Sequence, residues 1–340
     1  MKSLIYEHHP LTDMTTFGVP AHARFLVALK QTDDIPYILG DVRFAHMPIM
    51  ILGGGSNILF TKDFEGCIIK NEISYLDILS ETDDHVIVSV GAGYDWHDFV
   101  MYATERGWGG VENLALIPGT VGAAPVQNIG AYGIEVAETI VSIDVYNRVT
   151  GNYEELLASD CAFGYRTSIF KTTARDTYII TGVVFRLSKN AQPRTTYAAL
   201  VQYLDEQNIS HPSLIDIRDA VIAIRRSKLP DPRVLGNAGS FFKNPYITQD
   251  AYHALLAVYP DMPSFEADAD HVKVPAAFLI DRAGWKGRRI GAVGVHDKQA
   301  LVIVHYGGGT GQDIVDLAHA IQADVFEKYG IHIEPEVNVW

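Results

Sequence analysis

The short segment 236–245 carries the side chains of this chain that are best suited to chemistry. It reads GNAGSFFKNP, so Ser240 follows two glycines and precedes a cation, Lys243, and an amide, Asn244. No Gly-x-Ser-x-Gly pattern surrounds Ser240 and no histidine lies within ten residues of it, which argues against a nucleophilic serine. Glycines also let a ligand approach the backbone closely. The segment favours a hydroxyl that donates a proton to a polar, anionic ligand, although a tight turn that enters an apolar strand fits the same residues.

Two charged residues elsewhere could act on a carboxylate or on a developing negative charge. Arg166 lies in the segment 163–168, FGYRTS, where its planar guanidinium could fork onto a carboxylate. A surface ion pair is an equally good interpretation. Glu336 lies among apolar neighbours in an extended segment, where partial burial would raise its pKa. A surface carboxylate on an edge strand explains that residue equally well.

Three glycine-rich loops compete for the role of a phosphate cradle. The loop 53–57, GGGSN, follows an apolar run, and its successive N–H groups could form a nest for a pyrophosphate. The loop 91–93, GAG, lacks the third glycine of the dinucleotide fingerprint. The loop 307–311, GGGTG, could bind an anion at the start of a helix but lacks the Lys-Ser/Thr of a P-loop. Each loop, taken alone, is also compatible with an ordinary turn.

The stretch 117–133 gives a stronger signal for ligand binding. It reads IPGTVGAAPVQNIGAYG and has almost no bulky side chains over its length. A purely structural segment of this length would carry more side chains for packing. The open backbone suits a large planar or phosphorylated ligand, and Gln127 and Asn128 add amide donors and acceptors.

The composition narrows the class of protein. The net charge is −14, with 27 Lys and Arg against 41 Asp and Glu, which argues against a nucleic-acid partner because phosphate contacts need a basic face. The two cysteines, Cys67 and Cys161, form no CxxC pair, and no histidine pattern predicts a metal site. No apolar run approaches the roughly 18–20 residues that span a bilayer. These features predict a cytoplasmic protein without membrane insertion.

The predicted elements place the candidate segments at the ends of strands and helices. Apolar runs predict strands at 48–52, 85–90, 140–147, 178–187 and 301–305. Helical spacing of apolar residues predicts one helix that is capped by Asp95 and another over 313–329. The segment 331–340, which carries Glu336, is predicted to be a strand. The mixture predicts an α+β fold with mixed sheets, and the length of 340 residues predicts two or three domains.

Eight segments, taken in order, resemble the UDP-N-acetylenolpyruvoylglucosamine reductase (MurB) family, flavoenzymes of peptidoglycan precursor synthesis. They are 16–18, 53–57, 117–133, 164–166, 228–231, 236–245, 280–287 and 334–337. The set covers nearly the whole chain. This sequence departs from the family's pattern at His305, where relatives usually carry Asn.

The resemblance implies an FAD-binding fold of the PCMH/vanillyl-alcohol-oxidase type, with two α/β subdomains and a C-terminal α+β substrate-binding domain. The implied boundaries are 1–71, joined by the strand 331–340, then 72–229 and 230–330. The implied cofactor is non-covalent FAD, because no pattern for a histidine-linked flavin is visible. The implied electron donor is NADPH and the implied partner is a UDP-sugar substrate. We further expect a cytoplasmic monomer that binds no nucleic acid.

The resemblance also assigns roles to individual positions. Ser240 matches the proton donor, Arg166 the catalytic arginine and Glu336 the catalytic glutamate. The positions that match FAD contacts are Gly53, Gly54, Gly55, Ser56, Asn57, Ile117, Pro118, Gly119, Thr120, Gly122, Ala123, Gln127, Asn128, Gly130, Ala131, Tyr132 and Gly133. The positions that match substrate contacts are Tyr197, Lys228, Asn244 and Gln299. No position matches a metal ligand.

Two other functions compete with this one. An FAD-dependent oxidase of the same fold would reoxidise its reduced flavin rapidly with oxygen and would need no enolpyruvyl sugar. A non-catalytic UDP-sugar-binding protein would be colourless when purified. The combination of Ser240, Arg166 and Glu336 argues against both, because a simple binding protein does not need an acid beside a clamp for an oxyanion.

Overall fold

The computed structural model describes residues 4–340 and divides into two compact units. Unit 1 contains the described residues up to His9 together with Ala23–Gly54 and Glu65–Ser227. Unit 2 contains Pro10–His22, Gly55–Phe64 and Lys228–Trp340. The expected division into three domains, 1–71, 72–229 and 230–330, remains a prediction. Residues 1–3 of the expected first domain lie outside the described part of the chain.

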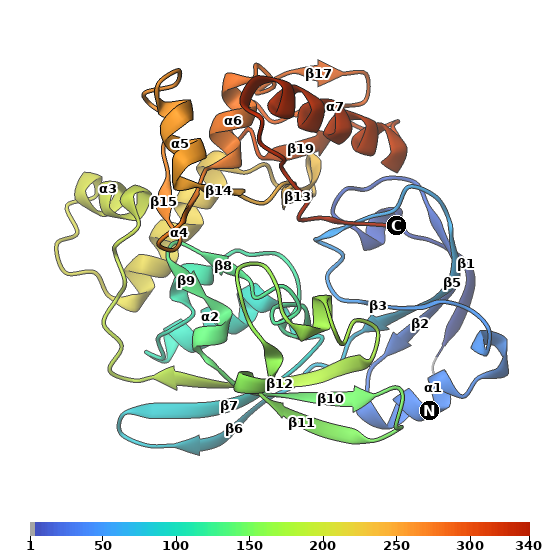
Figure 1. Cartoon of the computed structure of the whole chain (residues 1–340). Coiled ribbons are helices and arrows are strands. Elements are labelled where there is room, and N and C mark those ends of the chain that lie inside the picture. Colours follow the sequence, from blue (N-terminus) through green and yellow to red (C-terminus); the bar gives the residue numbers. More distant parts are fainter. Residues whose placement is uncertain (1–3) are drawn as a thin grey trace. The chain divides into compact units, whose positions relative to one another are not determined.

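The larger sheet of unit 1 has five strands in the order β11-β10-β12-β7-β6, and every neighbouring pair is antiparallel (Figure 1). The strands are β6 (Leu76–Glu81), β7 (His85–Gly91), β10 (Ile140–Asn147), β11 (Tyr153–Leu157) and β12 (Tyr178–Ser188). Helix α2 (Trp96–Glu105) packs on this sheet, with the ring centroids of Phe99 and Phe185 4.7 Å apart. As expected, the Asp95 carboxylate caps α2 by accepting the Asp98 N–H at 3.0 Å. The strands expected at 85–90, 140–147 and 178–187 are confirmed.

A second sheet of unit 1 has four strands in the order β1-β2-β5-β3. The strands are β1 (Ile5–Pro10), β2 (His22–Leu29), β3 (Ile49–Leu52) and β5 (Phe64–Asn71). β3 and β5 are parallel, so unit 1 combines parallel and antiparallel pairing, as the prediction of mixed sheets requires. The remaining elements are α1 (Ile35–Leu39), α3 (Ala198–Glu206), α4 (Leu214–Lys228), β8 (Gly130–Ala131) and β9 (Ile134–Glu135). Short 3₁₀ helices occupy Thr32–Asp34, Val42–Phe44, Glu112–Leu114, Val121–Ala123, Val136–Glu138, Ala158–Cys161 and Ile169–Lys171.

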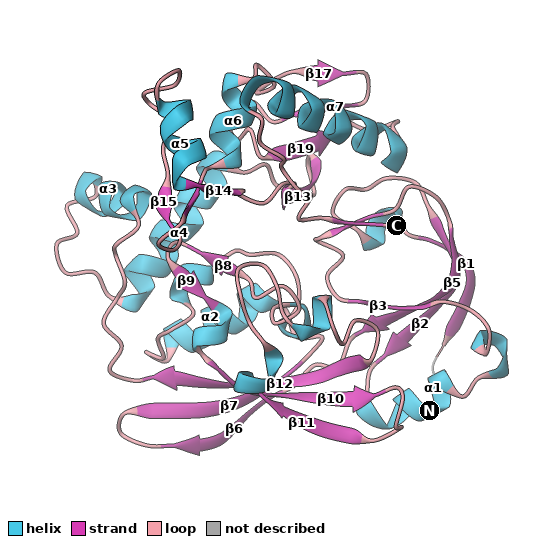
Figure 2. Cartoon of the chain, in the orientation of Figure 1, coloured by secondary structure: helices cyan, strands magenta, loops and turns pink. Residues whose placement is uncertain are grey.

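Unit 2 is built around an antiparallel sheet in the order β13-β19-β18-β17. The strands are β13 (Gly236–Ser240), β17 (Arg289–Ile290), β18 (Val293–Val295) and β19 (Val302–His305). Helices α6 (Ala276–Arg282) and α7 (Gly311–Tyr329) lie beside one another, and α7 contacts β18 and β19 (Figure 2). The remaining elements are β14 (Tyr246–Thr248), β15 (Phe265–Glu266), β16 (His271–Lys273), α5 (Gln249–Leu256), β4 (Ile58–Leu59), β20 (Asn338–Val339) and a 3₁₀ helix, Thr12–Met14.

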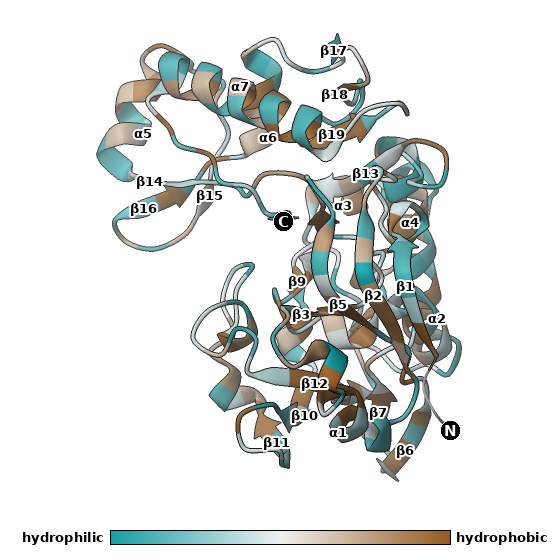
Figure 3. Cartoon of the chain, turned by 90° about the vertical axis from the view of Figure 1, so that its right-hand side faces the viewer, coloured by the Kyte–Doolittle hydropathy of each residue, from teal (hydrophilic) through white to brown (hydrophobic). Residues whose placement is uncertain are grey.

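Helix α7 forms where the sequence pattern predicts it, for physical reasons that are visible at both ends. At its start the Thr310 hydroxyl accepts the Asp313 N–H and the Asp313 carboxylate accepts the Thr310 N–H, which completes a capping box. At its end Gly330 adopts a left-handed conformation, with φ of 65°. Brown and teal segments alternate along α7 in Figure 3, and the buried stripe contains Ile314, Leu317, Ala318, Ile321 and Val325. The helix begins at Gly311, two residues before the predicted start.

One prediction about the extended segments is wrong in extent. The segment 331–340 was expected to be a continuous strand, but strand β20 covers only Asn338–Val339. Pro335 makes one isolated bridge to Phe242, and proline cannot donate to a ladder, which limits regular pairing there. Among the described residues, no helix is long and apolar enough to cross a bilayer.

Candidate active site

Unit 2 places Ser240 and Glu336 on neighbouring backbone segments. Ser240 is the last residue of β13, and the Phe241 N–H after it donates to the Leu301 carbonyl oxygen at 2.8 Å. On its other side the same segment pairs with the C-terminal residues, because the Glu336 N–H donates to the Phe241 carbonyl oxygen at 2.7 Å. Backbone pairing therefore places the segments that carry Ser240 and Glu336, 96 positions apart in the numbering, side by side in unit 2. Both side chains are partly buried.

The buried side chain of Asn237 fixes the bend that leads to Ser240. Its amide nitrogen donates to the carbonyl oxygens of Pro230 at 3.2 Å and Leu235 at 2.8 Å. Its carbonyl oxygen accepts the Gly239 N–H at 2.9 Å, where Gly239 has a φ of 69°, a left-handed conformation that favours glycine. The register of β13 against β19 shifts between Asn237 and Ser240. These hydrogen bonds fix the bend that positions Ser240. The role of Asn237 in this bend is not predicted by the sequence analysis.

His305 has a structural role that explains its presence in unit 2. The ring is buried, its Nδ1 lies 3.0 Å from the Phe17 carbonyl oxygen, and its Nε2 accepts the Gly309 N–H at 3.0 Å. Because Nε2 accepts this hydrogen bond, Nδ1 is the ring nitrogen that donates to the Phe17 carbonyl oxygen. Gly236 pairs with His305, and a Cβ at Gly236 would lie 2.2 Å from the Phe17 carbonyl oxygen. His305 and Gly236 therefore hold the segment 16–18 against the strand that carries Ser240.

The predicted phosphate loop 53–57 is divided between the two units. In unit 2, the Asn57 amide donates to the Glu336 carbonyl oxygen at 3.4 Å, and the Asn57 carbonyl oxygen accepts the Asn338 N–H at 3.2 Å. Gly55 has a φ of 65°, and a Cβ there would lie 1.9 Å from the Met14 carbonyl oxygen. The second half of this loop therefore supports the segment that carries Glu336.

In unit 1, the first half of the loop lies against the stretch 117–133. A Cβ at Gly54 would lie 2.7 Å from the Gly119 Cα, and a Cβ at Gly53 would lie 2.8 Å from the Thr120 Oγ1. The Lys70 ammonium donates to the Gly53 carbonyl oxygen, and burial lowers the pKa of Lys70. The loop 53–57 and the stretch 117–133, both predicted from the sequence to bind FAD, therefore lie against one another at Gly53 and Gly54.

These contacts allow a test of whether unit 1 fits FAD. The Thr120 Oγ1 is buried and has no hydrogen-bond partner within the described chain, so a polar ligand atom could satisfy it. Gly53 and Gly54 let the backbone of the loop pack directly against Gly119 and Thr120, where a side chain would clash. A flavin dinucleotide presents the phosphate and amide groups that such a backbone cradle would bind. The residues present therefore fit the cofactor.

Arg166 lies at the tip of a tight turn in unit 1. Gly164 and Thr167 exchange backbone hydrogen bonds of 3.1 and 3.2 Å around it. Arg166 has a φ of 55°, which costs a non-glycine residue on the order of 1 kcal/mol. Its Nη2 donates to the Gly130 carbonyl oxygen at 2.6 Å, and its guanidinium carbon lies 5.2 Å from the Tyr165 ring centroid. The guanidinium is therefore tied to the predicted flavin-binding stretch.

Asn128 ties the same stretch to the turn that carries Arg166. Its side chain is buried, and its amide nitrogen donates to Glu135 Oε2 at 2.7 Å and to the Gly164 carbonyl oxygen at 3.1 Å. Its carbonyl oxygen accepts the Ala137 N–H at 3.1 Å. The side chain of Asn128 therefore holds the turn that carries Arg166 in place. The predicted FAD contact at Asn128 would then involve its backbone. The sequence alone does not show that Asn128 is the buried polar residue of this stretch.

The other predicted site residues are distributed over both units. In unit 1, the rings of Tyr197 and Tyr132 meet edge to face with centroids 5.1 Å apart, and burial raises the pKa of Tyr132. In unit 2, the Asn244 side-chain oxygen accepts the Ala276 N–H at 2.9 Å, so α6 holds its amide group in place. The Gln299 side-chain oxygen accepts the Leu301 N–H at 3.4 Å. Lys228 is exposed at the end of α4.

His97 accepts a hydrogen bond just before the predicted flavin-binding stretch, and this bond depends on pH. Its Nδ1 accepts the Leu116 N–H at 3.1 Å, and Leu116 has a φ of 58°. Burial lowers the pKa of His97 below its usual 6.5, while two nearby aspartates oppose the shift and two arginines add to it with smaller effects. The neutral ring is therefore the folded form, so its stabilisation is present above pH 6.5 and is lost as the pH falls through the lowered pKa.

We expect the midpoint of thermal unfolding to fall more steeply between pH 7 and pH 5 in the wild-type chain than in His97→Gln. Gln keeps an acceptor for the Leu116 N–H at every pH, and one such bond contributes about 1 kcal/mol. The expected difference at pH 5 is about 2–4 °C, measured by calorimetry. His46→Gln, at an exposed histidine of unit 1, is the control and should follow the wild type. Parallel curves for all three proteins would contradict this role.

Comparison with known proteins defines the class of protein first. Residues 23–156 match the family described as FAD binding domain. This match includes Gly53, Gly54 and the whole stretch 117–133, which the structure brings together in unit 1. The chain is therefore an FAD-binding protein, and the prediction of an FAD-binding α+β fold is confirmed.

The second unit and the full-length relatives then define the family. Residues 231–340 match the family described as UDP-N-acetylenolpyruvoylglucosamine reductase, C-terminal domain. The UDP-N-acetylenolpyruvoylglucosamine reductase of Burkholderia cenocepacia (strain HI2424) is 49% identical over 330 residues, which cover 96% of this chain and 95% of that protein. The corresponding protein of Burkholderia multivorans (strain ATCC 17616 / 249) is 48% identical over the same shares. The chain belongs to the UDP-N-acetylenolpyruvoylglucosamine reductase family.

A solved structure supports the fold over the whole length. The crystal structure of UDP-N-acetylenolpyruvylglucosamine reductase (MurB) from Thermus caldophilus matches with a TM-score of 0.68 and 23% sequence identity. The match covers 100% of this chain and 99% of that chain. It supports the fold of this family over the length of the chain.

Proposed function

We propose that this chain is an FAD-dependent oxidoreductase that reduces UDP-N-acetylglucosamine enolpyruvate to UDP-N-acetylmuramate in peptidoglycan precursor synthesis. The observation that carries the proposal is the backbone pairing that fixes Ser240 beside the Glu336 segment, in a chain of this family. A binding protein would have no use for an acid and a carboxylate held in this way. Peptidoglycan precursor synthesis also accounts for a role in cell shape and division.

The reaction has a specific chemical difficulty. An enol ether is electron-rich and resists hydride, so its conjugation to a carboxylate is the only route to activation. FAD, held by the residues of the loop 53–57 and the stretch 117–133, would supply the hydride when bound. The negative charge that reaches the substrate carboxylate then has to be stabilised by the protein. We assign this role to the Arg166 guanidinium and to a protonated Glu336, because one such contact is worth about 10²–10³ in rate.

Ser240 completes the reduction by donating a proton to the neighbouring carbon. A serine hydroxyl is a weak acid, so it protonates only a strongly basic centre, and an enolate-like carbon is such a centre. General acid catalysis of this kind contributes about 10²–10⁴ in rate. The bend at Asn237 and Gly239 supports the assignment, because proton transfer needs the donor within hydrogen-bond reach.

The finer assignments are also part of the proposal. FAD is bound without a covalent link, and NADPH is the electron donor. Tyr197, Lys228, Asn244 and Gln299 hold the UDP-sugar. The protein is a monomer of the cytoplasm and binds no nucleic acid, which the net charge of −14 supports.

An anaerobic stopped-flow experiment on the purified wild-type protein tests the function. NADPH should bleach the flavin absorption, and UDP-N-acetylglucosamine enolpyruvate should then restore it without oxygen. Recovery with oxygen alone would favour an oxidase of the same fold. A protein that stays colourless after addition of FAD would favour a UDP-sugar-binding protein without catalysis.

A further inference from the structure

Asn113 joins two segments of unit 1 through a single amide group. It lies in the 3₁₀ helix Glu112–Leu114 and its side chain is fully buried. Its amide nitrogen donates to the carbonyl oxygens of Tyr132 and Arg194, each at 3.1 Å. One side chain therefore sets the separation between the predicted flavin-binding stretch and the segment that precedes α3.

The two segments that Asn113 joins carry the two tyrosines whose rings meet. Tyr132 accepts the Asn113 hydrogen bond through its own carbonyl oxygen, and Tyr197 lies three residues after Arg194. The rings of Tyr132 and Tyr197 are inclined by 74° with centroids 5.1 Å apart. On its far side Tyr197 leads directly into α3, whose Leu200 is buried in the core. Tyr197 is thus anchored by packing after it and by hydrogen bonds before it.

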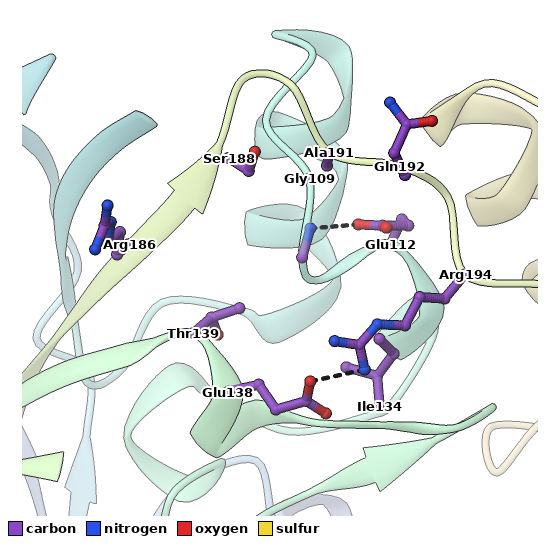
Figure 4. A pocket seen from close by; sticks show the side chains of 11 residues that line it. Gly109, Glu112, Ile134, Glu138, Thr139, Arg186, Ser188, Ala191, Gln192 and Arg194 are labelled. Carbon is purple, nitrogen blue, oxygen red and sulfur yellow. Dashed lines mark hydrogen bonds and ion pairs between the residues drawn. The ribbon is translucent and has the colours of Figure 1, made fainter. Parts of the chain in front are cut away.

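The segment before Tyr197 has little apolar support. It borders a cavity of about 260 Å³, which lies between the segment 109–112, the 3₁₀ helix Val136–Glu138 and the end of β12 (Figure 4). The lining includes Glu112, Glu138, Arg186 and Gln192, and apolar side chains are few. Residues 191–196 alternate between half-buried and exposed positions, so polar contacts contribute to the position of this segment.

Within the described residues, Arg194 takes part in two polar contacts that differ in strength, one through its carbonyl oxygen and one through its guanidinium. Arg194 Nη1 lies 2.8 Å from Glu138 Oε2, as Figure 4 shows, but both side chains are substantially exposed, so the pair contributes about 0–1 kcal/mol. The Asn113 side chain is fully buried and its two hydrogen bonds are partly buried, so losing its donors costs more than losing the exposed ion pair. Asn113 is therefore the main anchor and the ion pair is an outer support.

We propose that Asn113 is a positioning residue that holds Tyr197 against Tyr132 in the geometry that receives the UDP-sugar. This inference rests on the proposed function, in which Tyr197 contacts the substrate. Without the anchor, the segment occupies several positions and the receptive one is only fractionally populated. The apparent affinity for the sugar falls in proportion to that fraction, while bound substrate still reacts at the usual rate.

The test measures the dissociation constant of the oxidised protein for the UDP-sugar, from the change in flavin absorption, together with the limiting rate of reoxidation. Asn113→Asp has the same shape but places an oxygen opposite two carbonyl oxygens. We expect the dissociation constant to rise about 10-fold, which corresponds to about 1.4 kcal/mol, with the limiting rate within about 2-fold of wild type. A fall in the limiting rate with an unchanged dissociation constant would overturn the inference.

A double-mutant cycle separates positioning from a general loss of structure. In the Tyr197→Ala background, Asn113→Asp should change the dissociation constant by less than about 2-fold, because the ring it positions is gone. A full 10-fold effect in both backgrounds would overturn the inference alone. If Tyr197→Ala leaves the dissociation constant unchanged, the proposed substrate contact of Tyr197 fails, and the inference fails with it.

A milder variant covers the case in which Asn113→Asp does not fold. Arg194→Gln removes the exposed ion pair with Glu138 and should raise the dissociation constant about 2–4-fold. Arg186→Gln is the matched control, because Arg186 is also exposed and lines the same cavity, and it should bind like the wild type. Equal effects of the two arginine variants would contradict the proposal.

Discussion

Ser240→Ala is expected to slow the reoxidation of reduced flavin by UDP-N-acetylglucosamine enolpyruvate by about 10²–10⁴-fold. The substitution removes the only hydroxyl of the bend between Asn237 and Phe241 and leaves the backbone hydrogen bonds of that bend in place. Flavin reduction by NADPH needs no proton from this residue, so its rate should stay within about 2–3-fold of the wild type. Rapid-mixing absorbance measurements of each half-reaction give the two rates separately.

Ser240→Cys is the informative companion variant. A thiol is a stronger acid than an alcohol, so this variant should recover part of the rate that Ser240→Ala loses. Flavin content and the midpoint of thermal unfolding should be unchanged in both variants, because the hydrogen bonds of the bend are made by the Asn237 side chain and by backbone groups. Equal slowing of both half-reactions would contradict the assignment of Ser240 as a proton donor.

Arg166→Lys should lower the limiting rate of the sugar half-reaction by about 10²–10³-fold, or about 3–4 kcal/mol of transition-state stabilisation. Lysine keeps the positive charge but loses the planar fork, which in the present structure donates to the Gly130 carbonyl oxygen. An ammonium cannot make that bond and still offer two parallel donors to a carboxylate. Steady-state and single-turnover rates over a range of sugar concentrations measure the effect.

Arg148→Lys is a matched control for this substitution. Arg148 also belongs to unit 1 and donates to a backbone carbonyl oxygen, that of Asp176, but it lies in an exposed region outside the candidate site. Its rates should equal those of the wild type. If Arg166→Lys retains more than about a tenth of the wild-type rate, charge alone suffices and the forked contact has no catalytic role.

Much of the fold could be predicted because its signals are local. The strand at 140–147 and the helices capped by Asp95 and Thr310 follow from apolar periodicity and from short polar caps. Helix α4 was missed although its signal is present: Ile217, Val221 and Ile224 recur at helical spacing and are buried.

The candidate site was less predictable because its contacts are not local. The pairing of the Ser240 strand with the Glu336 segment joins distant parts of the chain, and local patterns do not encode register at that distance. Asn113, Asn128 and Asn237 are all buried and each binds backbone groups of other segments. A sequence shows that an amide is present but not that it is buried. Only the resemblance to a known family groups Ser240, Arg166 and Glu336 as predicted catalytic residues.

The division of the chain into units has a consequence for its biosynthesis. Unit 2 takes Phe17 and Leu59 into the same apolar core as residues of its C-terminal part, such as Ile303 and Val337. At a synthesis rate of roughly 5–20 residues per second, the segment that contains Leu59 leaves the ribosome roughly 15–60 s before that core can close. During this interval the segments that contain Phe17 and Leu59 lack their partners from the C-terminal part of unit 2, while the residues of unit 1 are being completed. The core of unit 2 can therefore form only after the residues of unit 1 have been synthesised.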